Sequence, residues 1–169
     1  MNKTDKLAIE GGTPVFKQPI VYGVSGPSIV GDEEISAVTE LLRNQQLFRH
    51  REFSETGLME KEAADFIGTK YALMVNSGTS ALICALIGVG IGPGDEVIVP
   101  GYTFIATASA VVAVGAVPVI AEVDESLGLS PRDVEKKITP YTKAIVPVHM
   151  RGIPARLDEL IKVAKQNGL

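Results

Sequence analysis

The fold is decided by residues 71–123, which read YALMVNSGTSALICALIGVGIGPGDEVIVPGYTFIATASAVVAVGAVPVIAEV. Short, continuous apolar runs alternate in this stretch with longer apolar runs, and glycine or proline stands between them. The pattern predicts strands at 71–75, 97–99 and 117–123, helices at 78–89 and 106–114, and a turn at 92–96. Apolar strands that alternate with helices indicate an α/β fold, in which a mostly parallel sheet is covered by helices on both faces.

The alternation continues toward the C-terminus. Residues 130–133, SPRD, predict a capping box with Pro131 at the first position of a helix. A strand is predicted at 144–149, and a helix at 155–167 that Gly168 ends. The unit of strand and helix is therefore expected to repeat up to the last residues of the chain.

Two more helices are predicted on the N-terminal side. The first opens with the acidic run at 32–34, whose charges suit a helix N-terminus, and Gly68 ends the second. Residues 1–30 are rich in glycine and proline and have no hydrophobic period. We therefore expect an extended N-terminal arm at 1–30, followed by the N-terminal portion of an α/β domain at 31–169.

The composition excludes several classes of function. The chain has 169 residues, of which 46% are hydrophobic and 21% charged, the balance of an ordinary globular domain. A net charge of −4 and scattered basic residues give no reason to expect a nucleic-acid partner. A single cysteine, Cys84, excludes an internal disulfide, fits a cytoplasmic compartment and is expected in the core. With two distant histidines it forms no metal site.

One stretch has the length of a membrane span. Residues 97–121 carry no charge and are long enough to cross a bilayer. Pro100, Gly101, Gly115 and Pro118 interrupt them, so we interpret the stretch as strand, loop, helix and strand of a buried core. The first residues have no apolar signal core, and we expect no contact with a membrane.

The first candidate site follows the strand predicted at 71–75. The sequence there is Asn76-Ser77-Gly78-Thr79-Ser80, with a helix predicted from the glycine onward. Free backbone N–H groups at a helix start bind anions, and the hydroxyls of Ser77, Thr79 and Ser80 add donors. An ordinary Ser/Thr helix cap explains the same residues equally well. No Gly-Lys-Ser/Thr follows, so this is not a nucleotide phosphate loop.

Further candidates follow other predicted strands or lie in a polar loop. Phe104 comes after the strand at 97–99, and it is either the cover of a planar ligand ring or a core aromatic residue. His149 ends the strand at 144–149 and either contacts a substrate or bonds the backbone. His50 and its neighbour Arg49 lie in a polar loop, as solvated residues or as substrate contacts. Ends of parallel strands meet at one edge of a sheet, where α/β proteins bind ligands.

Three segments in this order resemble the DegT/DnrJ/StrS family of sugar aminotransferases. They are VNSGTSAL from residue 75, GVGIGPGDEVIVPGYTFIATASAVVAVGAVPV from residue 88, and VDESLGLSPRDVEKKITPYTKAIVPVHMRGIPARLDEL from residue 123. The resemblance covers the chain from about Pro27 to Leu169. LFRH and PVHMRGIPARLDE are most similar to the members that aminate an eight-carbon keto-sugar acid of the Kdo type.

The resemblance implies a cofactor, a partner and roles for the candidate residues. It implies a type I fold that binds pyridoxal 5′-phosphate (PLP) and transfers an amino group, from a donor such as glutamate, to a keto-sugar. The PLP phosphate would lie at residues 77–80, and Phe104 would stack on the pyridine ring. Arg49, His50 and His149 would contact the sugar substrate. The resemblance also implies a homodimer that shares its active sites across the interface.

The family's catalytic residues are not found in this chain. PLP chemistry needs a lysine bound to the cofactor and an acid beside the pyridine nitrogen. In the family, both residues come later in the sequence than the segment that this chain matches. No lysine of this chain stands in the sequence context of the family's catalytic lysine. Asp124 matches a structural turn of the family and not the acid beside the pyridine. We therefore expect a truncated N-terminal half without catalytic residues, which a C-terminal half in trans would complete. The alternative is a non-catalytic binding or assembly module that keeps the phosphate site and the dimer surface.

Overall fold

A computed structural model of the chain divides into two compact units, residues 1–59 and 60–169. The structure describes residues 6–16, 18, 29–50 and 54–169. Most of the expected arm at 1–30 lies outside the described residues, so the arm stays a prediction. Within it, Ala8–Glu10 forms one short 3-10 turn (η2), which Gly11 ends with a φ of 88°.

The first unit contains the helix α1, Asp32–Arg43, and the beginning of α2, Glu55–Ile67. The acidic start of α1 forms as expected: the Gly31 N–H donates a hydrogen bond to the Glu34 carboxylate over 2.7 Å. That bond lowers the pKa of Glu34. Gly68 ends α2 with a positive φ of 79°, and its N–H bonds to the carbonyl of Ala64. The start of α1 and the end of α2 therefore lie where the sequence predicts them.

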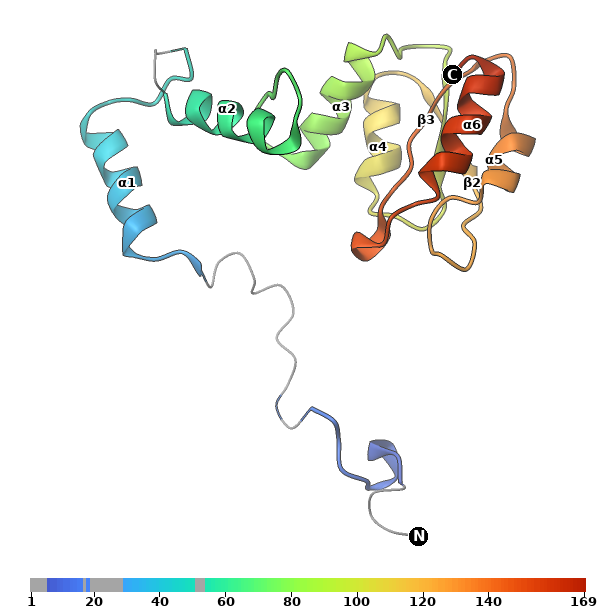
Figure 1. Cartoon of the computed structure of the whole chain (residues 1–169), viewed down its shortest axis with the longest axis horizontal. Coiled ribbons are helices and arrows are strands. Elements are labelled where there is room, and N and C mark those ends of the chain that lie inside the picture. The colour runs from blue at the N-terminus through green and yellow to red at the C-terminus, as the bar shows by residue number, and fades with distance from the viewer. Residues whose placement is uncertain (1–5, 17, 19–28, 51–53) are drawn as a thin grey trace. The chain divides into compact units, whose positions relative to one another are not determined.

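The second unit is built on a three-stranded parallel sheet, as the sequence predicts (Figure 1). Its strands are β1 (Glu96–Pro100), β2 (Val117–Ala121) and β3 (Thr142–Ile145). The strand order is β2-β1-β3, so β1 lies in the middle, with Ile98 opposite Val119 on one side and Ile145 on the other. Three parallel strands with their carboxyl ends at one edge define where a ligand site can form.

Helices cover both faces of this sheet, as predicted (Figure 1). On one face lie α3 (Gly78–Gly88) and α4 (Ala106–Ala113), and on the other lie α5 (Pro131–Lys137) and α6 (Leu157–Asn167). The side chains of β1 point alternately to the two faces, Val97 and Val99 toward α3 and α4, Ile98 toward α5 and α6. The uncharged stretch at 97–121 therefore forms β1, a loop, α4 and β2. Among the described residues, no helix is long and apolar enough to cross a membrane.

The predicted strand at 71–75 does not form. These residues pair with no strand of the described chain, and Tyr71 is 77% exposed. Their backbone bonds to side chains instead: the Met74 N–H donates to Oε1 of Glu60 on α2 over 2.8 Å, and the Tyr71 carbonyl accepts the Thr69 hydroxyl over 3.1 Å. The prediction was wrong because an apolar run becomes a strand only where another strand receives its backbone hydrogen bonds.

Other expectations need smaller corrections. The predicted capping box at 130–133 is wrong: Ser130 makes no side-chain cap, and Asp133 instead accepts the Glu122 N–H over 2.9 Å. Pro131 is the first helical residue, as predicted. β3 ends at Ile145, four residues before the predicted end, although the Val146 N–H still bonds to the Ile98 carbonyl. Cys84 was expected in the core and is exposed, because the face of α3 that packs into the core carries Leu86 and not Cys84.

Candidate functional site

A cavity of about 550 Å³ opens at the carboxyl ends of β1 and β3, beside the N-terminus of α3. Three segments meet there: the first turns of α3, the loop after β1 with the start of α4, and the loop after β3. The lining residues are Gly78, Thr79, Leu82, Thr103, Phe104, Ala106, Thr107, Val146, Pro147, Val148, His149 and Met150. The structure therefore brings four of the predicted site residues together: Gly78, Thr79, Phe104 and His149.

The start of α3 contains a helix cap, and its first turn lines the cavity. Ser77 is the N-cap residue, and its Oγ accepts the Ser80 N–H and donates to Ser80 Oγ, each over 3.0 Å. These two serines satisfy each other and are not part of the cavity lining. Gly78 and Thr79 do line the cavity, and N–H groups in the first turn of a helix have no intrahelical acceptor. The helix-cap interpretation is confirmed for Ser77 and Ser80, and anion binding at Gly78 and Thr79 stays a prediction.

Space at Gly78 is a second feature of this position. Apart from its chain neighbours and the backbone of its own helix, a Cβ built on Gly78 would meet no protein atom within 4 Å. The backbone there is thus open on the side where a side chain would otherwise project. A glycine at the first position of a helix allows an anion to approach the N–H groups closely.

Phe104 lies in the loop between β1 and α4, and the residue is 75% exposed. The alternative interpretation as a core aromatic residue is therefore wrong. Behind it, the Oγ1 atoms of Thr103 and Thr107 lie 2.9 Å apart, and the Thr107 N–H donates to the Phe104 carbonyl over 3.1 Å. Neither threonine was among the predicted site residues. Their separation of four residues, next to a predicted helix start, was the sequence signal that could have indicated a contact between the two hydroxyls.

His149 both lines the cavity and bonds the backbone. Its Nδ1 accepts a hydrogen bond from the Ala155 N–H over 3.0 Å. In a neutral imidazole that accepts at Nδ1, the proton is carried by Nε2. The two roles left open for this residue are compatible, since one nitrogen is used by the backbone and the other remains a donor.

Two predicted substrate residues lie in the first compact unit. Arg49 and His50 are exposed and follow α1 in the chain, and the Arg49 carbonyl accepts a hydrogen bond from Ser54 Oγ over 2.9 Å. The cavity belongs entirely to the second unit. A role for Arg49 and His50 in substrate binding therefore stays a prediction.

The cavity lining contains no lysine, arginine, aspartate or glutamate. Asp124 belongs to the turn after β2, where its carboxylate accepts bonds from the Ser126 hydroxyl over 2.6 Å and the Ser126 N–H over 2.9 Å. The Ser126 hydroxyl, with help from Arg156, holds the pKa of Asp124 below its usual value. This supports a structural turn, as expected. Within the part of the chain that the structure describes, no cluster of His, Cys, Asp or Glu is arranged to hold a metal ion.

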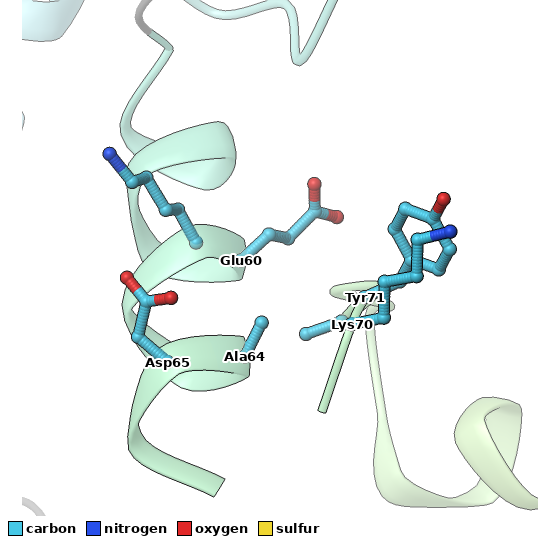
Figure 2. A pocket seen from close by; sticks show the side chains of 7 residues that line it. Glu60, Ala64, Asp65, Lys70 and Tyr71 are labelled. Atoms are coloured by element: carbon cyan, nitrogen blue, oxygen red, sulfur yellow. The ribbon is translucent and has the colours of Figure 1, made fainter. Parts of the chain in front are cut away.

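A second cavity, of about 260 Å³, lies between α2 and the segment that follows it (Figure 2). Figure 2 shows Glu60 and Ala64 on the helix facing Lys70 and Tyr71, while Asp65 points away. The Lys70 Nζ lies 5.0 Å from the centre of the Tyr71 ring, within the range of a cation–π contact. Acidic and basic side chains both line this cavity, and none of the predicted site residues does.

Comparison with known proteins adds a family to this geometry. The sequence profile of the DegT/DnrJ/EryC1/StrS aminotransferase family matches residues 28–169. The spore coat polysaccharide biosynthesis protein SpsC of Bacillus subtilis is 44% identical over 142 residues, which cover 83% of this chain and 36% of SpsC. GDP-perosamine synthase of Caulobacter vibrioides is 47% identical over 111 residues, which cover 65% of this chain and 30% of the synthase.

A solved structure of the same kind is NtdA of Bacillus subtilis with bound cofactor PMP. It superposes with a TM-score of 0.76 at 30% identity, over 83% of this chain and 33% of NtdA. The expected type I fold is thereby confirmed. The chain spans about a third of the length of the curated relatives it matches.

Proposed function

Because this chain belongs to the DegT/DnrJ/EryC1/StrS aminotransferase family, we propose that it forms the cofactor-binding part of a PLP-dependent aminotransferase acting on a keto-sugar. Aminotransferases of this family use PLP, and related structures include PLP and PMP forms. The observation that carries the proposal is the cavity that joins the start of α3 to Phe104 and His149.

The start of α3 fits the phosphate of PLP. The N–H groups of Gly78 and Thr79 and the positive end of the helix dipole suit a dianion. The open space at Gly78 lets the phosphate approach the backbone, and the Thr79 hydroxyl adds a donor. Ser77 and Ser80 belong to the proposed site as the pair that holds this turn in place.

The exposed Phe104 ring fits the face of the pyridine. A flat apolar ring that solvent reaches is a suitable stacking surface for an aromatic cofactor, and the cavity beside it is lined mostly by apolar residues. Bound PLP supplies an electron sink for amino-group transfer. The role of Phe104 is to hold the plane of the cofactor ring, and the apolar lining limits the access of water.

His149 is proposed to contact the substrate. Since Nδ1 is engaged with the Ala155 N–H, the Nε2–H is the group that remains to donate a hydrogen bond to a sugar oxygen. Arg49 and His50 are proposed to bind the sugar as well, and the positive charge of Arg49 suits an acidic sugar. Two relatives support a sugar substrate by their names: GDP-perosamine synthase and UDP-2-acetamido-2-deoxy-3-oxo-D-glucuronate aminotransferase. An eight-carbon keto-sugar acid stays a prediction.

The lysine and the acid of PLP chemistry must come from outside the cavity lining, which holds neither. We propose that a C-terminal half of the fold supplies both, in trans if it is a separate chain, and that the assembled enzyme is a homodimer with glutamate as the amino donor. The absence of a lysine from the described lining also favours a second candidate, a binding or assembly module without catalysis. Amino transfer by the chain together with a C-terminal half separates the two candidates.

Two phenylalanines provide the test of the cofactor site. PLP affinity is measured by equilibrium dialysis for the unsubstituted chain, alone and together with the C-terminal half of a relative, and for Phe104→Ala and Phe66→Ala. Phe66 is the matched control, because it is 93% exposed on α2 and does not line the cavity. We expect Phe104→Ala to weaken binding by about tenfold, the value of one aromatic stacking contact, and Phe66→Ala to leave it unchanged. Equal effects of both substitutions, or no binding in either setting, would contradict the proposal.

A further inference from the structure

The loop that carries Phe104 is held at its base by Thr103 and Thr107. The Oγ1 atoms of the two threonines lie within hydrogen-bond distance, 2.9 Å apart. Thr107 also donates its backbone N–H to the carbonyl of Phe104, over 3.1 Å. A single residue is therefore bonded both to the backbone of Phe104 and to the side chain of the residue before it.

The Phe104 ring does not hold its own position by packing. Its large exposed fraction leaves the ring few side-chain contacts, so its orientation depends on the backbone beneath it. The other end of the loop is tied by the Gly101 N–H, which donates to the Ala121 carbonyl of β2 over 2.9 Å. Thr107 supplies the corresponding ties at the α4 end.

Thr107 is buried, and burial strengthens the hydrogen bond that its hydroxyl makes with Thr103. It is 7% exposed, lies in the first turn of α4 and lines the same cavity as the ring. A buried hydroxyl that has a partner resists displacement, because breaking the bond leaves a polar group without either water or protein to replace it.

We propose that Thr107 is a positioning residue for Phe104, whose hydroxyl and N–H together fix the loop at 101–105 in the orientation that presents the ring to a planar ligand. The proposal deepens the function proposed above and rests on it where the ligand is PLP. The fixing of the loop itself does not depend on any ligand, so the two are tested separately.

The first measurement needs no cofactor. Hydrogen exchange of the Thr107 and Ser109 amides, which bond to the carbonyls of Phe104 and Ile105, reports how well the loop is held. Thr107→Val removes the hydroxyl at nearly constant shape, and Thr107→Ser restores a hydroxyl. The matched control is Thr142→Val, since Thr142 is 4% exposed and its hydroxyl accepts the Thr139 N–H at the opposite edge of the sheet.

We expect Thr107→Val to raise these exchange rates about tenfold, the effect of losing one net hydrogen bond, with exchange in β1 unchanged. Thr107→Ser is expected to restore protection, and Thr142→Val to leave this loop protected. The proposal is overturned if Thr107→Val leaves the rates unchanged, if serine fails to restore them, or if Thr142→Val raises them as much.

The second measurement compares two ligands. Inorganic phosphate probes the start of α3 alone, whereas PLP also needs the Phe104 ring. We expect Thr107→Val to weaken PLP binding about fivefold and to leave phosphate binding unchanged, because only ring stacking depends on the loop. Equal weakening of both ligands would overturn the positioning role. If the unsubstituted chain binds phosphate and not PLP while the exchange result holds, the loop proposal is supported and the proposed cofactor is wrong.

Discussion

The Nδ1 atom of His149 accepts a hydrogen bond from the backbone N–H of Ala155 over 3.0 Å. The bond closes the loop between β3 and α6, which contains the 3-10 turn Met150–Gly152 (η4) with Arg151 at a positive φ of 55°. Because the bond uses Nδ1, Nε2 is the ring nitrogen that remains to donate a hydrogen bond. The same side chain thus connects the stability of the loop to the proposed chemistry of the cavity.

These two roles of His149 are expected to separate by substitution. His149→Ala removes the acceptor and is expected to lower the free energy of unfolding by about 1 kcal/mol, measured by urea denaturation. His149→Asn keeps an acceptor near the Nδ1 position and is expected to unfold close to the unsubstituted chain, while lacking the Nε2 donor. Equal stability of all three proteins would contradict a structural role for the bond.

A methyl group at Gly78 is expected to block the phosphate without harming the fold. In Gly78→Ala the new Cβ meets no packed neighbour, and alanine favours a helix more than glycine does, so we expect unchanged or slightly higher stability. The same methyl group would occupy the space proposed for the phosphate, so we expect PLP binding to weaken about tenfold. Gly88→Ala is the matched control, because Gly88 lies at the other end of α3 and is equally open. Weaker binding in both variants, or in neither, would remove Gly78 from the phosphate site.

The turn at Asp124 is expected to make stability depend on pH. The pKa of Asp124 is lowered in the folded state, so its charged form stabilises the fold above the unfolded pKa of about 4 and loses this effect as pH falls through the folded pKa. Asp124→Asn is therefore expected to be less stable than the unsubstituted chain near neutral pH, with the gap closing at acidic pH. A gap in urea unfolding that is constant from pH 7 to acid would contradict this.

Lysine labelling tests where the covalent chemistry lies. After incubation with PLP and reduction with borohydride, we expect no single lysine of this chain to be labelled stoichiometrically, because none lines the cavity. Peptide mass mapping provides the measurement, and the C-terminal half of a relative, added in the same reaction, serves as the positive control. One fully labelled lysine within this chain would show that the chain itself supplies the group.

Complementation tests the proposed division of labour. Co-expression of this chain with the C-terminal half of a relative is expected to give amino transfer from glutamate to a keto-sugar, which neither part performs alone, because groups on both sides of the cofactor are needed. Thr79→Ala and Phe104→Ala in this chain are expected to reduce cofactor retention in the copurified complex. Unchanged retention in both variants would show that the cofactor site is assigned to the wrong residues.

Much of the fold was predictable because it depends on local patterns. The apolar runs predicted as strands at 97–99 and 117–123 form β1 and most of β2, and glycines such as Gly68 and Gly168 end helices through their own backbone freedom. Strand direction then places the loops after β1 and β3 at one edge of the sheet, so Phe104 and His149 were correctly expected near each other.

The features that the sequence did not predict depend on strands that pair from distant parts of the chain, or on which of several possible local hydrogen bonds forms. The run at 71–75 has the composition of a strand, but pairing decides whether it becomes one, and in the described chain no strand pairs with it. Sequence also left two roles open for the residues at 77–80. In the structure Ser77 and Ser80 bond each other, which confirms the helix cap, while Gly78 and Thr79 line the cavity.

The sequence by itself determined the parallel α/β architecture, the family, and the edge of the sheet at which the candidate site forms. Only the tertiary structure decided that Phe104 is exposed, that the Thr107 N–H bonds to its carbonyl, and that His149 uses Nδ1 for the Ala155 N–H. The physical reason is range: hydrophobic period and helix caps act within a few residues, whereas burial and the choice of hydrogen-bond partner are settled only when separate segments pack together.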